Sequence, residues 1–126
     1  MHVVYNHRRV QRGTQDQFII RINNEYRSPM GIAEETPLDI TGWEFELYIH
    51  RNVEMNDNNI IYQTTGVVYG SNGAVAFTIP AEETDIKPNV YWYTIRYTRP
   101  NGKTYQGTSS KYIIAESLNT YFSLYK

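Results

Sequence analysis

Apolar and polar side chains alternate along four stretches of the chain. In the clearest of them, residues 43–49, every second side chain is apolar and most of those between are polar. Because successive side chains of a β-strand point to opposite faces of a sheet, this period of two predicts half-buried strands. The four strands are expected to begin at Phe18, Trp43, Val75 and Tyr91. Shorter strands are predicted at residues 3–10, 59–63 and 111–115.

Turn-forming residues separate these strands. Residues 100–103, Pro-Asn-Gly-Lys, predict a tight hairpin, because Asn-Gly supplies the positive φ angles of a tight turn. A second turn is expected at residues 70–73, and a single helical turn at residues 80–84. No amphipathic helix is predicted, so the chain reads as strands and turns.

Short strands with regular turns are typical of a sandwich or small barrel. We expect an all-β, immunoglobulin-like antiparallel β-sandwich made of two packed sheets. Trp43 is expected to lie buried between the sheets, with Glu44 and Glu46 facing outward. The whole chain, residues 1–126, is expected to form one domain with a core at about 12–115 and short N- and C-terminal arms.

Composition supports β structure and excludes several classes of function. Tyr accounts for 12 of the 126 residues, and aromatic residues favour pleated sheets. The absence of cysteine excludes disulfides, thiolate metal sites and cysteine nucleophiles. The formal net charge of -1 argues against bulk polyanion binding. No signal peptide or transmembrane helix is expected, so we expect a protein made in the cytosol that stays soluble.

Three polar groups are candidate metal sites. Glu44, Glu46 and His50 share the outer face of one expected strand, where neighbours two apart lie roughly 6–7 Å from each other. Such an extended row rarely closes a coordination sphere, so a solvated strand face is the favoured interpretation. The acidic turn at residues 82–85 and the Asn-rich residues 56–59 lack the ligand spacing of a calcium loop. We therefore expect no metal and no other cofactor.

No catalytic motif stands out in the sequence. There is no Gly-x-Ser-x-Gly elbow, phosphate-binding loop or dinucleotide fingerprint. The sequence leaves open a Ser-His-acid triad assembled from residues far apart in the chain, because a triad is defined by its geometry and not by its order in the sequence. We interpret the chain as a non-enzyme with no catalytic residues.

The two ends of the chain hold the candidate partner-binding residues. The N-terminal candidates are His7, Arg8, Arg9 and Arg12. Such a basic stretch can bind nucleic acid, but an arm or edge strand on a partner protein is the favoured interpretation. The C-terminal candidates are Leu118, Tyr121, Phe122, Leu124 and Tyr125. Because free tails are usually polar, this segment either adds a strand to its own sandwich or docks on a partner.

Six phrases, in order along the chain, carry a family resemblance. They are Arg-Gly-Thr at 12–14, Phe-Ile-Ile at 18–20, Pro-Leu-Asp-Ile-Thr-Gly-Trp at 37–43, Gly-Ala-Val-Ala-Phe-Thr-Ile-Pro at 73–80, Asn-Val-Tyr-Trp-Tyr-Thr-Ile at 89–95 and Lys-Tyr-Ile-Ile at 111–114, the last preceded by the Asn-Gly turn at 101–102 and by Gly107. Together they resemble the immunoglobulin-like N-terminal domain of phage baseplate upper proteins and related tailed-phage virion proteins. The resemblance covers roughly residues 12–115.

The resemblance implies a structural role in the virion of a tailed phage. The chain would be a small adaptor or decoration protein at the tail, baseplate, neck or capsid. It would assemble with other virion proteins, be oligomeric in the particle, and use no small-molecule substrate, nucleic acid or membrane. The alternative is a module that binds host glycans or another host surface through exposed Tyr side chains and Trp92. A domain associated with a hydrolase is the weakest of the alternatives.

Overall fold

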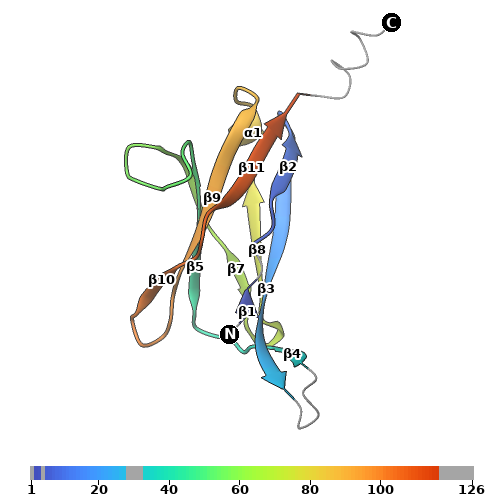
Figure 1. Ribbon diagram of the computed structural model, residues 1–126, viewed down its shortest axis with the longest axis vertical. Coiled ribbons are helices and arrows are strands. Elements are labelled where there is room, and N and C mark those ends of the chain that lie inside the picture. The colour runs from blue at the N-terminus through green and yellow to red at the C-terminus, as the bar shows by residue number, and fades with distance from the viewer. Residues whose placement is uncertain (1, 4, 28–32, 117–126) are drawn as a thin grey trace, which may run out of the picture.

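The computed structural model describes residues 2–3, 5–27 and 33–116, which form two sheets packed face to face (Figure 1). The smaller sheet has the strand order β1-β3-β8-β7, with β4 added to β3. The larger has the order β2-β11-β9-β5-β6, with β10 added to β9. The elements are β1 (His2–Val3), β2 (Arg8–Gln11), β3 (Asp16–Arg27), β4 (Ala33–Pro37), β5 (Glu44–His50), β6 (Ile60–Thr65), β7 (Val67–Tyr69), η1 (Gly70–Asn72), β8 (Ala74–Ile79), α1 (Ala81–Thr84), β9 (Asn89–Thr98), β10 (Thr104–Gln106) and β11 (Ser110–Ala115).

This strand order confirms the predicted all-β sandwich. Strands β1, β3, β8 and β7 correspond to A, B, E and D of an immunoglobulin-like fold, and β5, β9 and β11 to C, F and G. One pair departs from the expected antiparallel arrangement, because β2 runs parallel to β11, with Arg8 opposite Tyr112 and Gln11 opposite Ala115. The basic N-terminal stretch is therefore an edge strand of the larger sheet, which is one of the two alternatives that the sequence left open.

The inner faces of the two sheets form one apolar core. The expected alternation is confirmed in β3, where Phe18, Ile20 and Ile22 are buried, and in β8, where Val75, Phe77 and Ile79 are fully buried. Each such side chain contributes roughly 1.5–3 kcal/mol by leaving water. The larger sheet contributes Phe45, Leu47 and Ile49 from β5 and Tyr91, Tyr93, Ile95, Tyr112 and Ile114 from β9 and β11.

Trp43 is only partly buried, so the expectation that it lies between the sheets is wrong. It precedes β5, and Phe45, two residues further along, takes the buried position at 1% exposure. The indole stacks on Tyr97 at 5.7 Å between ring centroids and lies 4.9 Å below the guanidinium of Arg99. The ring therefore covers the rim of the core instead of filling its centre. Glu44 is exposed, as predicted.

A tyrosine ties the corner between the two sheets to the larger one. The hydroxyl of Tyr91, near the start of β9, donates a 2.6 Å hydrogen bond to the backbone oxygen of Lys87. This is the arrangement of the tyrosine corner in immunoglobulin-like domains. The helical turn predicted at residues 80–84 is present as α1, and Thr84 anchors it by donating a 2.6 Å bond to the backbone oxygen of Thr14.

Two glycines permit local geometry that another residue would obstruct. Gly102 adopts φ +84° in the β9–β10 hairpin, which confirms a turn at this position, but Asn101 does not adopt the positive φ angle that was expected for it as well. Gly66 lies between β6 in the larger sheet and β7 in the smaller, where the chain changes sheets. A Cβ atom on Gly66 would lie 2.4 Å from Cγ1 of Val75 and 2.8 Å from Cε1 of Phe77. The crossing therefore depends on the absence of a side chain.

None of the described helices is long and apolar enough to cross a membrane.

Candidate interaction surfaces and cavity

Arg8, a predicted partner-binding residue, is engaged inside the domain. Its guanidinium donates two hydrogen bonds to the carboxylate of Asp16, at 3.1 and 2.5 Å, and lies 4.3 Å from the centre of the Phe18 ring. Asp16 is only 6% exposed, and its carboxylate also accepts a 3.0 Å bond from the hydroxyl of Tyr112. Burial, together with the Asp16 charge, raises the pKa of Tyr112 well above its usual value. Arg8 thus neutralises a buried carboxylate and joins β2 to β3.

The other three N-terminal candidates differ in their surroundings. Arg12 bonds Asp85 at 3.0 Å and Glu116 at 3.3 Å, and the hydrogen bond to Asp85 is the main reason that its pKa is raised. The Nδ1 atom of His7 accepts a 2.9 Å bond from the backbone N–H of Lys111. Arg9 is exposed and makes no ion pair with the described residues. A partner contact through Arg9 and His7 stays a prediction.

The five C-terminal candidates lie outside the described residues. They are Leu118, Tyr121, Phe122, Leu124 and Tyr125. The choice between an internal strand and a partner contact therefore stays open for this segment.

His50 is fully buried, which corrects the expectation of a solvated row with Glu44 and Glu46. The pairing of β5 with β6 shifts register between Ile49 and His50, and the following turn brings the backbone oxygen of Asn52 to 2.6 Å from Nδ1. Since a carbonyl oxygen only accepts, Nδ1 carries the proton and Nε2 accepts from the hydroxyl of Thr94 at 2.8 Å. Burial lowers the pKa of His50, against the opposing effect of the Asn52 bond.

These contacts leave His50 without an open ring nitrogen. Both nitrogens are engaged, and the hydroxyl of Thr94 lies 2.8 Å from that of Ser109. Glu46 instead bonds the hydroxyl of Tyr48 and the amide of Gln63. No cluster of three or more metal-ligating His, Cys, Asp or Glu side chains occurs in the described part of the chain.

An apolar row crosses the outer face of the smaller sheet. Ile19 of β3 pairs with Ala76 of β8, which pairs in turn with Val67 of β7. Tyr69 lies beside Ala74 in the next row that faces outward. Ile19, Val67 and Tyr69 are 53%, 59% and 52% exposed, whereas the alanines between them are nearly covered. We call Ile19, Val67, Tyr69, Ala74 and Ala76 the apolar row. An outward sheet face is ordinarily polar, so this row is a candidate contact surface.

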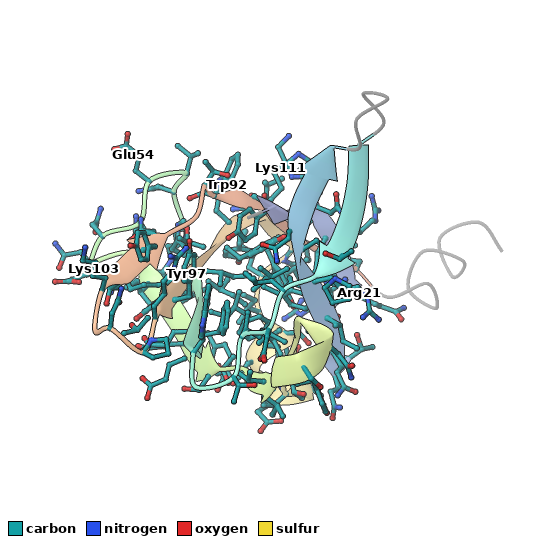
Figure 2. The ribbon with its side chains drawn as sticks, turned by 90° about the horizontal axis from the view of Figure 1, so that it is seen from below. Arg21, Glu54, Trp92, Tyr97, Lys103 and Lys111 are labelled. Atoms are coloured by element: carbon teal, nitrogen blue, oxygen red, sulfur yellow. The ribbon has the colours of Figure 1, made fainter. Side chains whose placement is uncertain are left out.

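A group of aromatic side chains surrounds the β9–β10 hairpin. Tyr105 stacks on Tyr97 at 5.3 Å between centroids, and the guanidinium of Arg99 lies 4.8 Å from the Tyr105 ring. These side chains pack largely on one another. Figure 2 shows Trp92 and Lys111, which pair across β9 and β11, close together at the top of the view, and Arg21 at its right. Trp92, proposed from sequence as a glycan contact, is only partly exposed.

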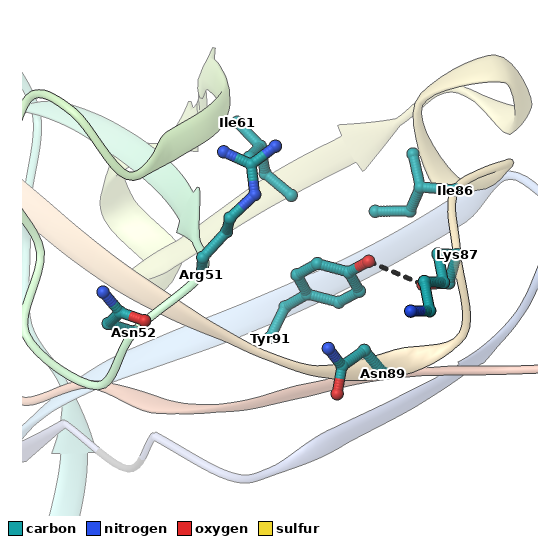
Figure 3. Close-up of a pocket in the computed structure, with 7 residues that line it drawn as sticks. All are labelled: Arg51, Asn52, Ile61, Ile86, Lys87, Asn89 and Tyr91. Atoms are coloured by element: carbon teal, nitrogen blue, oxygen red, sulfur yellow. Dashed lines mark hydrogen bonds between the residues drawn. The ribbon is translucent and has the colours of Figure 1, made fainter.

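A cavity of about 520 Å³ opens at the end of the sandwich that holds α1 (Figure 3). Arg51 and Asn52 reach it from the end of β5, Ile61 from β6, Ile86 and Lys87 from the corner, and Asn89 and Tyr91 from β9. Its volume lies within the range of small-molecule sites. No local pattern in the sequence marks this group, because its members come from segments far apart in the chain. Among them only Tyr91 carries a local signal, since it opens a predicted strand.

Comparisons with known proteins bear on the fold. No protein-family model matches the sequence, and the search of curated proteins gives no match. Among solved structures, the chain is similar to the PmoD soluble domain from Methylocystis sp. ATCC 49242 (Rockwell), with a TM-score of 0.50 and 13% sequence identity. The similarity covers 85% of this chain and 77% of that one. At this identity it supports the all-β sandwich architecture and carries no functional assignment.

Proposed function

We propose that this chain is a structural protein of a tailed-phage virion that acts by binding other virion proteins. The apolar row is the observation that carries the proposal. Three large apolar side chains, each more than half exposed, lie together on a rigid sheet. Covering them would remove apolar surface from water at roughly 25 cal/mol per Å². Because a sheet is stiff, little conformational entropy opposes such an association.

Two further features support assembly as the mode of action. Strand β7 is the edge of the smaller sheet, so its outer backbone groups lie beside the apolar row and can pair with a strand of a partner. The sequence phrases that resemble phage baseplate upper proteins support a role of this kind. Its position in the particle would be the tail, baseplate, neck or capsid, and its partners other virion proteins.

We also propose that the chain is not an enzyme. A catalytic triad needs an imidazole bonded to a hydroxyl. Among the described residues, the imidazole of His50 bonds the hydroxyl of Thr94. It is fully buried and bonded at both nitrogens, so it has no position from which to take a substrate proton. A contact function requires only the exposed surfaces described above.

Substitution within the apolar row tests the assembly proposal. Val67→Lys places a charge in the row, and Val90→Lys is a matched control, because Val90 is also an exposed strand valine but lies on the larger sheet. Both variants should fold with unchanged far-UV spectra. We expect Val67→Lys to weaken binding to the particle by about tenfold, equivalent to about 1.4 kcal/mol of binding free energy, and so to lower the copy number in purified particles. Val90→Lys should assemble normally.

Quantitative mass spectrometry of the particles gives the copy number. Wild-type incorporation of Val67→Lys would rule out the apolar row as the assembly surface. Absence of the wild-type chain from purified particles would rule out the virion function itself.

A further inference from the structure

The cavity beside α1 concentrates positive charge that the domain does not neutralise. Arg51 and Lys87 both line it, and neither makes an ion pair within the described part of the chain. Arg8 and Arg12, in contrast, each have carboxylate partners. No carboxylate belongs to the described lining of the cavity. Two cations that line one recess, with no acid in its described lining, favour an anion there.

The remaining lining is suited to more than a bare anion. Ile61, Ile86 and the ring of Tyr91 form apolar wall, while Asn52 and Asn89 supply amides. The Oδ1 atom of Asn89 accepts a 2.8 Å bond from the backbone N–H of Val90, which leaves the NH₂ group as a donor. Apolar wall combined with a few polar groups is the usual composition of a small-molecule site.

The tyrosine corner holds this wall in place. Because the Tyr91 hydroxyl donates to the backbone oxygen of Lys87, the ring and the Lys87 backbone are fixed relative to each other (Figure 3). The hydrogen bond from His50 Nδ1 to the oxygen of Asn52 similarly fixes the turn that carries Arg51. Two parts of the lining are thus preorganised, which lowers the entropic cost of binding.

We propose that this cavity binds one residue of an anionic saccharide, a sugar that carries a carboxylate or a phosphate. Arg51 and Lys87 bind the anionic group, the two asparagine amides bond ring hydroxyls, and the apolar faces of the sugar pack against Tyr91 and Ile86. Neither an inorganic anion nor a neutral sugar satisfies all of these groups. The proposal goes beyond the assembly function and does not depend on the apolar row.

Titration of the full chain with four probes tests the proposal. The probes are glucuronate, glucose 6-phosphate, glucose and inorganic phosphate, each followed by backbone amide chemical shifts. We expect at least one of the two anionic sugars to bind about tenfold more tightly than glucose and than phosphate. The stronger of the two identifies carboxylate or phosphate as the preferred anion. Its shifts should centre on residues 51–52 and 86–91.

Three outcomes would overturn the proposal. If glucose bound as tightly as the anionic sugars, the two cations would have no part in binding. If phosphate bound as tightly as the anionic sugars, the apolar wall would have none. A lack of binding by both anionic sugars at millimolar concentration would remove the site.

Charge-removing variants locate the binding site. Arg51→Gln and Lys87→Gln should each weaken the anionic sugar about tenfold, the value of one charge-assisted hydrogen bond. Lys111→Gln is the matched control, because Lys111 is an exposed cation on β11 that does not line the cavity. Equal effects of all three substitutions would show that general charge, and not this cavity, attracts the ligand. Unchanged binding in both cavity variants would likewise refute the assignment.

Discussion

Replacing Arg8 with Ala should destabilise the domain far more than replacing its neighbour Arg9. Arg8 supplies two of the three hydrogen bonds that the described residues donate to the carboxylate of Asp16, and Tyr112 supplies the third. Arg8→Ala would leave that carboxylate, which is 6% exposed in the intact domain, bonded only to a neutral hydroxyl. Arg9 is exposed and makes no such contact.

The magnitude follows from the burial of the carboxylate. Breaking a buried ion pair by removing one partner costs about 3–5 kcal/mol, because an uncompensated charge stays in the interior. The Arg8 side chain itself is 31% exposed, so water replaces part of what is lost and the lower end of that range applies. We therefore expect about 3 kcal/mol for Arg8→Ala and within about 0.5 kcal/mol for Arg9→Ala, as at an ordinary surface site.

Urea unfolding followed by tryptophan fluorescence measures both free energies. The double variant Arg8→Ala with Asp16→Asn serves as the control, because it removes the buried charge together with its partner. The double variant should lose less stability than the sum of the two single variants. A cost below about 1 kcal/mol for Arg8→Ala, or strictly additive effects, would refute the reasoning and return Arg8 to the set of candidate contact residues.

Three further predictions concern single residues. Because the pKa of His50 is lowered in the folded domain, the unfolded chain binds the proton of this imidazole more readily. The free energy of unfolding should therefore be highest above about pH 6.5 and fall as the pH is lowered below that value. Urea unfolding between pH 7 and 5 should show that this free energy depends less steeply on pH in His50→Gln. Gly66→Ala should cost at least about 2 kcal/mol in the same assay, because the added methyl group collides with Val75. Trp43→Ala should cost about 2 kcal/mol and Phe45→Ala about 3–5 kcal/mol, since only the second side chain is fully buried; equal costs would contradict the burial described here.

The strands could be predicted because their cause is local. In a half-buried strand, the alternation of side chains records directly which face meets the core, as in the run from Phe18 to Ile22. The Asn-Gly turn is equally local, because its positive φ angle depends on the residue that adopts it. Trp43 shows the limit of this reasoning. Alternation assigns its face correctly but does not show that the residue lies at the rim, beyond the end of the strand.

The candidate sites could not be predicted because they depend on distant segments. The burial of His50 requires the Asn52 turn and Thr94, neither of which is implied by the pattern of β5. The cavity joins Arg51 to Lys87, which are separated by several strands in sequence. The apolar row follows from the register of β3, β8 and β7, which the sequence does not specify.

The parallel pairing of β2 with β11 has a consequence for how this domain reaches its native state. The bond between Lys111 and His7 joins residues that are 104 positions apart. During synthesis β2 leaves the ribosome early and has no partner for its backbone until β11 follows. Until then β2 stays unpaired in solvent, and the carboxylate of Asp16, which is buried in the folded domain, remains exposed to water. Closing so long a loop carries an entropic cost before any contact offsets it. We expect the docking of β2 to be a late event in folding, and the interval before it to be the time when the nascent sandwich is most exposed to aggregation.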